Sequence, residues 1–193
     1  EGAAALAGAP SSPGTRRALR RALDGLAVLD PACGGGSLLA AAWLAASGAG
    51  ARLRLLGREL SPLAARAARA RLALLGARAS IRAGDALASP WPACDLLLMN
   101  PPFLRHESMP AGRKARAAAR SGLSRQADLS AHLVLLALRH APVCGLVLPR
   151  ALEVSRSAAP LREEAETRGG FPVVLRSRAA GSFAASVATS LAL

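Results

Sequence analysis

The sequence predicts an α/β fold, a doubly wound and mostly parallel sheet of seven strands whose last strand is antiparallel. Short apolar runs alternate with helical segments along the chain, which is typical of parallel sheets. A glycine-rich turn, Gly34–Gly36, follows the first run, and two adjacent prolines, Pro101 and Pro102, follow the fourth. Ligands of open α/β sheets bind at the carboxyl ends of the strands, so both breaks mark candidate sites.

The first half of the chain alternates strand and helix after a loose start. Residues 1–15 are rich in Ala, Gly, Pro and Ser and are expected to form a loose lead-in. Ser61 before Pro62 is a good helix start, and Gly76 suits the end of the same helix. The expected strands are 26–30, 53–56 and 80–82, and the expected helices are 16–23, 37–47 and 61–75.

The second half begins with an apolar strand over 95–99, which must stop at the prolines because proline donates no ladder hydrogen bond. A long polar loop is expected over 101–126. The last two strands are close enough in sequence to form a hairpin, so the final strand is expected to be antiparallel. The remaining expected elements are helices at 128–140 and 161–167 and strands at 145–148, 173–175 and 186–193.

Composition limits the class of protein. The chain has 193 residues, enough for a domain with a core, and a formal net charge of +13, which suits a nucleic-acid partner. Of its 25 basic residues only Lys114 is lysine, so GC-rich coding explains the charge equally well. Three widely spaced cysteines predict no disulfide and no metal site, and a cytoplasmic location.

No membrane segment or signal peptide is expected. The charge-free stretch 31–51 is long enough to cross a bilayer, but its five glycines and one proline favour a turn followed by a buried helix. The chain starts with Glu1 and is therefore expected to be processed or a fragment.

Two carboxylates follow neighbouring strands of the predicted sheet. Glu59 ends the second strand, where a carboxylate can accept hydrogen bonds from ribose hydroxyls. Asp85 follows the third strand, where a carboxylate can accept from an exocyclic adenine amine. Taken singly, each residue could also be an ordinary solvated or turn residue. Together with the glycine turn they indicate a nucleotide-like cofactor.

The segment Asn100–Phe103 predicts chemistry on an exocyclic amine. The side-chain oxygen of Asn100 and the carbonyl of Pro101 could accept both amino hydrogens, which localises the nitrogen lone pair. The ring of Phe103 offers a face for a flipped base. Transfer of a group to this amine would then depend on the alignment of the reactants and on electrostatics. A rigid turn is the alternative for this tetrapeptide taken alone.

These motifs resemble those of the S-adenosylmethionine (SAM)-dependent N6-adenine DNA methyltransferases, of the TaqI type and of type I and type IIG restriction systems. The resemblance covers about residues 10–193, and further matches lie at 127–133, 145–150, 161–162 and 185–190. It implies a Rossmann-like catalytic domain over 16–193 that methylates N6 of a flipped adenine in DNA, in a restriction-modification system. The implied cofactor residues are Asp30, Pro31, Ala32, Cys33, Gly34 and Gly36 for the methionine part, Glu59 for ribose and Asp85 for adenine. The implied catalytic residues are Asn100, Pro101, Pro102 and Phe103.

The sequence departs from this family in two places. Pro10–Pro13 replaces an aromatic-Thr-Pro motif, and Leu133 stands where an aromatic residue often stacks on the flipped base. These missing aromatic residues leave open a catalytically weak remnant that binds SAM or nucleic acid. Asn-Pro-Pro-Phe also occurs in methyltransferases of RNA (guanine N2) and of protein glutamine, so those activities stay open too.

Basic residues near the catalytic motif are expected to contact DNA phosphates without reading sequence, although a solvated helix face would look the same. The predicted sheet and its helices use every segment after the loop, so target recognition is expected from a separate domain or subunit. The expected phosphate contacts are Arg105, Arg113, Lys114 and Arg116.

Overall fold

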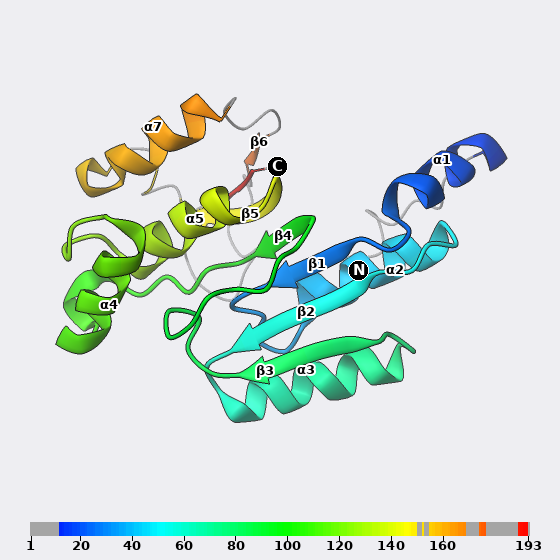
Figure 1. Cartoon of the computed structure of the whole chain (residues 1–193), viewed down its shortest axis with the longest axis horizontal. Helices are drawn as coiled ribbons and strands as arrows, with labels where there is room; N and C mark the ends of the chain where they lie inside the picture. Colours follow the sequence, from blue (N-terminus) through cyan, green and yellow to red (C-terminus); the bar gives the residue numbers. More distant parts are fainter. Residues whose placement is uncertain (1–11, 150–151, 153–154, 169–173, 177–188, 193) are drawn as a thin grey trace. The chain divides into compact units, whose positions relative to one another are not determined.

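The computed structural model describes residues 12–149, 152, 155–168, 174–176 and 189–192 (Figure 1). The chain divides into two compact units, residues 1–84 and residues 85–193.

The first unit contains three parallel strands in the order β3-β2-β1, with their carboxyl ends at one edge (Figure 1). Asp30 at the end of β1 pairs with Gly57, and Glu59 at the end of β2 pairs with Ala83. The strands are β1 (Ala27–Asp30), β2 (Arg54–Glu59) and β3 (Ala79–Ala83), and the helices are α1 (Pro13–Leu23), α2 (Ser37–Gly48) and α3 (Pro62–Leu74).

Local sequence explains where two of these helices begin. The hydroxyl of Ser12 accepts a hydrogen bond from the Thr15 amide at 3.2 Å, and the hydroxyl of Ser61 accepts one from the Ala64 amide at 3.3 Å. A proline follows each of these caps, at the first turn, where no amide hydrogen is needed. The predicted start at Ser61 is therefore confirmed.

Gly57 in the middle of the sheet is fixed by packing. A Cβ atom at this position would lie 2.5 Å from Cδ1 of Ile81, 3.1 Å from Sγ of Cys33 and 3.2 Å from Cδ1 of Leu39. Leu39 lies on α2 and Cys33 in the glycine-rich turn. The absence of a side chain at Gly57 thus allows the turn and α2 to pack directly on β2.

The second unit contains four strands in the order β4-β5-β7-β6. β5 is parallel to β4, whereas β7 is antiparallel to both β5 and β6. The strands are β4 (Leu96–Met99), β5 (Val143–Pro149), β6 (Val174–Arg176) and β7 (Thr189–Ala192). The helices are α4 (Ala111–Ser121), α5 (Leu129–His140) and α7 (Ala159–Thr167), with short 3-10 helices η1 (His106–Ser108) and η2 (Arg156–Ala158).

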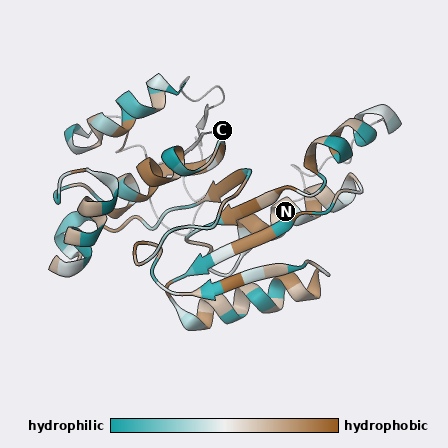
Figure 2. Cartoon of the chain, viewed as in Figure 1, coloured by the Kyte–Doolittle hydropathy of each residue, from teal (hydrophilic) through white to brown (hydrophobic). Residues whose placement is uncertain are grey.

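The hydropathy of the helices and strands matches their burial and position (Figure 2). Nine of the twelve residues of α5 are buried, and most of that helix is hydrophobic in Figure 2. The arrowhead ends of β2 and β3 are hydrophilic, as expected for an edge where polar ligands bind. In the part of the chain that the structure describes, no helix has the length and hydrophobicity needed to cross a bilayer.

The predicted number of strands and the antiparallel last strand are confirmed. α1 begins at Pro13 rather than Arg16, so the lead-in predicted over 1–15 contains the start of a helix, and residues 1–11 lie outside the described part. Residues 186–188 and 193 of the last predicted strand also lie outside it.

The prediction of a loop over 101–126 is wrong, because η1 and α4 lie within it. Alanine and arginine are strong helix formers, but the buried positions of α4 are the small residues Ala117 and Ser121. The basic residues Arg113, Arg116 and Arg120 recur three and four positions apart, which is a helical period, but the segment has no large apolar residue to mark a buried face.

Candidate cofactor and catalytic sites

The glycine-rich turn of the first unit has one packed face and one open face. Gly34 and Gly36 have positive φ angles of 52° and 79°, which favour glycine. A Cβ atom on Gly36 would lie 3.1 Å from Cβ of Ala68 on α3, whereas one on Gly34 or Gly35 would meet nothing within 4 Å. The backbone at Gly34 and Gly35 is therefore open to close approach by a ligand.

Glu59 links this turn to the end of β2 through hydrogen bonds. Its Oε2 accepts a hydrogen bond from the Gly34 amide at 2.9 Å, and its Oε1 accepts one from the Ser61 amide at 2.7 Å. A carboxylate has about four lone-pair sites, so further donors such as ribose hydroxyls could still bind. The structure thus brings Glu59 together with the glycine turn, as the sequence predicted, and adds a structural role that was not predicted.

Asp30 is buried at the end of β1, with 2% of its surface exposed. Burial raises its pKa from 3.8 to about 7, the Ala32 amide opposes this by donating to Oδ1 at 3.0 Å, and the negative charge of Glu59 adds to it. A cation near this carboxyl would favour the ionised form, and SAM brings a sulfonium and an ammonium group. The residues present therefore fit this cofactor.

The other predicted residues of this turn have packing roles. Pro31 and Cys33 are buried and Ala32 is half-buried. The Cys33 amide donates to the Arg58 carbonyl at 3.0 Å, which ties the turn to β2 a second time. Burial raises the pKa of the Cys33 thiol to about 12, so it stays protonated at neutral pH and is a poor nucleophile.

The predicted catalytic segment follows β4 in the second unit. Met99 and Pro101 are buried, whereas Asn100 and Pro102 are exposed and 37% of the Phe103 surface is exposed. The strand end and Pro101 thus fix the backbone, while the side chains of Asn100 and Phe103 are available to a ligand.

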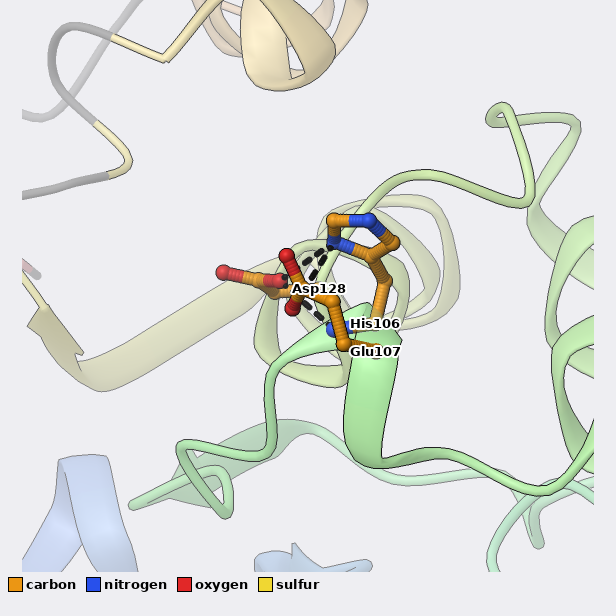
Figure 3. Close-up of side chains that lie close together, drawn as sticks. All are labelled: His106, Glu107 and Asp128. Carbon is orange, nitrogen blue, oxygen red and sulfur yellow. Dashed lines mark hydrogen bonds and ion pairs between the residues drawn. The ribbon is translucent and has the colours of Figure 1, made fainter.

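The loop after this segment is fastened to the start of α5 (Figure 3). The Leu129 amide donates to the Leu104 carbonyl at 3.0 Å, and the His106 amide donates to Oδ1 of Asp128 at 2.9 Å. Nδ1 of His106 also lies 3.4 Å from Oε2 of Glu107 and 3.6 Å from Oδ1 of Asp128. A protonated His106 would pair with both carboxylates and tighten the same connection.

These three side chains are of types that bind metals, and their ligand atoms lie within 4.8 Å of one another. This cluster could not be predicted from the sequence, because Asp128 is 22 residues from His106 and joins it only when α5 packs on the loop.

Asp85 begins the second unit and is held by α4. Its Oδ1 accepts a hydrogen bond from the Leu87 amide at 3.0 Å and lies 3.4 Å from Nη2 of Arg113, and its Oδ2 lies 3.5 Å from Nη1 of Arg116. One turn further along α4, Arg120 donates to the carbonyls of Ala86 and Ser89 at 2.7 and 3.0 Å. Three α4 arginines therefore hold the segment after β3.

The four residues predicted to contact phosphate fall into two pairs. Arg113 and Arg116 pair with Asp85. The sequence did not indicate this pairing, because the segment that forms α4 was predicted as a loop. Arg105 is exposed and Lys114 is half-buried, and neither side chain makes a hydrogen bond or ion pair within the described residues.

Comparison with solved structures identifies the fold. The chain resembles a candidate class I S-adenosylmethionine-dependent methyltransferase from Listeria monocytogenes, with a TM-score of 0.72 and 16% identity over 87% of this chain and 53% of that one. A type I restriction-modification methyltransferase subunit from Streptococcus thermophilus gives a TM-score of 0.71 and 20% identity over 94% of this chain and 43% of that one. The fold is that of the Rossmann-like SAM-dependent methyltransferases, as predicted.

The sequence identifies the family. The chain belongs to the N-6 DNA methylase family, whose sequence model matches residues 18–142, well over half of the chain. S-adenosylmethionine is accordingly its cofactor.

Other comparisons set the limits of this assignment. A candidate RNA methyltransferase from Pyrococcus horikoshii has the same fold, with a TM-score of 0.57 and 15% identity over 94% of this chain and 83% of that one. A search of the curated proteins found no match. The chain spans about half the length of the Listeria and Streptococcus proteins.

Proposed function

We propose that this chain is the catalytic domain, over residues 16–193, of a DNA methyltransferase that transfers a methyl group from SAM to N6 of adenine. The observation that supports this most directly is the exposed side chain of Asn100 at the end of β4, followed by Pro101, Pro102 and Phe103, in a chain of the N-6 DNA methylase family. DNA as substrate is consistent with a cytoplasmic enzyme.

The first unit would hold most of the cofactor. Asp30 and the turn from Pro31 to Gly36 would bind the methionine part, since the open backbone of Gly34 and Gly35 allows close approach. Glu59 would accept from the ribose hydroxyls with the lone pairs that Gly34 and Ser61 leave free. Asp85 would accept from the adenine amine. SAM supplies an electrophilic methyl group.

The second unit would prepare the acceptor. The lone pair of an exocyclic amine is delocalised into its ring, so the amine is a weak nucleophile. The side-chain oxygen of Asn100 and the carbonyl of Pro101 would each accept one amino hydrogen, which draws the nitrogen toward tetrahedral geometry. The partly exposed ring of Phe103 would stack on the flipped base. The amine then forms its bond to the methyl carbon as the carbon–sulfur bond breaks.

DNA would be held by basic side chains beside this segment. Arg105 and Lys114 would bind phosphates, and Arg113 and Arg116 would join them if they leave Asp85. We assign the reading of the target sequence to a separate domain or subunit. The Streptococcus relative is a subunit of a type I restriction-modification system, which supports the same context here.

RNA methylation is the second candidate, supported by the shared fold of the Pyrococcus protein. Incubation with labelled SAM and separate pools of DNA, RNA and protein would distinguish the acceptors. Label in DNA supports the proposal, and label only in RNA or only in protein contradicts it. Absence of label in all three pools, with SAM still bound, identifies a remnant without activity.

A further inference from the structure

Asp85 is the only predicted cofactor residue that the described structure pairs with arginines. Its side chain is 15% exposed and faces two guanidinium groups from one helix, Arg113 with 21% and Arg116 with 50% of the side chain exposed. Arg113 and Arg116 are three residues apart on α4 and therefore lie on one face of it. They meet the carboxylate that a cofactor amine would need.

The contact of Asp85 with Arg113 and Arg116 is weak enough for the two arginines to change partners. The closest nitrogen–oxygen distances, 3.4 and 3.5 Å, are long for charge-assisted hydrogen bonds, which typically measure about 2.7–2.9 Å. Nε of Arg113 is buried and has no hydrogen-bond partner among the described residues, which is unfavourable for Arg113 in this position. The pair with Arg116, whose side chain is half-exposed, contributes little stability.

Helix α4 is also held in place by contacts that do not involve Asp85. Arg120 donates short hydrogen bonds to Ala86 and Ser89, and its guanidinium lies 5.9 Å from the ring centre of Trp91. At the end of α4, the Ser121 hydroxyl lies 2.7 Å from Nδ1 of the buried His132 on α5. Arg113 and Arg116 can therefore change partners while α4 stays in place.

We propose that Arg113 and Arg116 couple cofactor binding to DNA binding. In the free chain they pair with Asp85 and compete with the adenine amine of the cofactor. DNA phosphates take up both guanidinium groups and leave Asp85 available as an acceptor. This inference rests on the proposed function, because it takes Asp85 as the adenine-binding residue and DNA as the substrate.

Linkage requires the effect to be reciprocal, so the cofactor raises DNA affinity by the same factor as DNA raises cofactor affinity. The test is calorimetric titration of S-adenosylhomocysteine, which has the same adenosine and no methyl group to transfer. It is measured with and without a short random DNA duplex. We expect the duplex to raise the affinity of the wild-type chain on the order of 5-fold.

The double variant Arg113→Gln/Arg116→Gln should bind S-adenosylhomocysteine about as tightly without DNA as the wild type does with it, and the duplex should have no further effect. Arg105 and Lys114 remain in this variant to bind the duplex. The matched control is Arg16→Gln/Arg17→Gln on α1, which removes the same charge from exposed positions. It should keep the response to DNA.

Three outcomes contradict the inference. Weaker cofactor binding by the Arg113/Arg116 variant would show that the arginines support Asp85 instead of competing for it. Wild-type affinity that does not change with DNA, or an equal loss of response in the α1 control, would exclude specific coupling.

The variant Asp85→Ala separates these failures from failure of the proposed function. Unchanged affinity in Asp85→Ala would remove the adenine role of Asp85, and the inference with it. Weaker binding in Asp85→Ala together with any of the three outcomes above overturns the coupling alone.

Discussion

The glycine-rich turn of the first unit and the loop after β4 of the second differ in how their polar groups are used. In the turn, both oxygens of Glu59 and one oxygen of Asp30 accept backbone hydrogen bonds. In the loop, the backbone is fastened at Leu104 and His106, while Asn100 stays exposed. The turn is therefore organised before a ligand arrives, and the loop presents a side chain. This is what separate cofactor-binding and catalytic regions require.

The largest expected effect comes from Asn100→Ala, which removes one proposed acceptor for the amine. We expect methyl transfer to fall by roughly 100-fold to 1000-fold or more, as for loss of a catalytic hydrogen bond. SAM affinity, measured by calorimetry, should stay within about twofold of wild type because Asn100 lies outside the glycine-rich turn. A large loss of SAM affinity in this variant would contradict the separation of roles.

Gly57→Ala tests whether the turn depends on close packing. The new Cβ atom would lie 2.5 Å from Ile81 and within about van der Waals contact of Cys33, so we expect a loss of roughly 1–3 kcal/mol in the free energy of unfolding. Denaturant titration measures it. Gly35→Ala is the control, because its Cβ meets nothing within 4 Å, and its stability should be nearly unchanged.

Glu59→Ala tests the connection between the turn and β2. It leaves the amides of Gly34 and Ser61 without their acceptor and removes the proposed ribose contact. SAM binding should weaken by about 1–3 kcal/mol in an equilibrium titration. Glu107→Ala, which removes an exposed carboxylate from the second unit, should bind SAM like wild type. Equal affinities in both variants would exclude Glu59 from the cofactor site.

Asp30 is expected to make the stability of the chain depend on pH. Its pKa is about 7 in the folded chain and 3.8 in the unfolded chain, so between these values the folded state holds a proton that the unfolded state has lost. The free energy of unfolding should therefore fall as pH rises from about 4 to 7, with a slope of up to about 1.4 kcal/mol per pH unit. Asp30→Asn should lack this component.

Cofactor binding should show the opposite trend at the same residue. If the cations of SAM favour ionised Asp30, affinity should decline as pH falls below about 7, at most tenfold per pH unit. Titrations across this range would detect it. A decline that persists in Asp30→Asn would place its cause elsewhere.

Local sequence signals predicted most of the first unit and both motifs. The cap at Ser61, the apolar runs of the strands and the glycines of the turn act over a few residues, so they can be read directly. The cap at Ser12 was missed, because it lies in a segment predicted as a loose lead-in. The pairing of Asp85 with Arg113 and Arg116 joins residues 28 and 31 positions apart. It depends on α4, a segment with no large apolar residue to mark a buried helix face. The link between His106 and Asp128 was missed because the two residues are 22 positions apart in the sequence.

The function proposed for this chain is methyl transfer to the exocyclic amine of adenine in DNA, with the side-chain oxygen of Asn100 accepting one hydrogen of that amine. The most direct measurement is nucleoside analysis by mass spectrometry of DNA incubated with SAM and either the wild-type chain or Asn100→Ala. If the chain alone binds DNA weakly, the reaction would also contain a separate recognition domain or subunit. We predict N6-methyl-2′-deoxyadenosine from the wild type and at least about 100-fold less of it from the variant. Methyl groups on another base, or equal N6 methylation by both chains, would contradict the account.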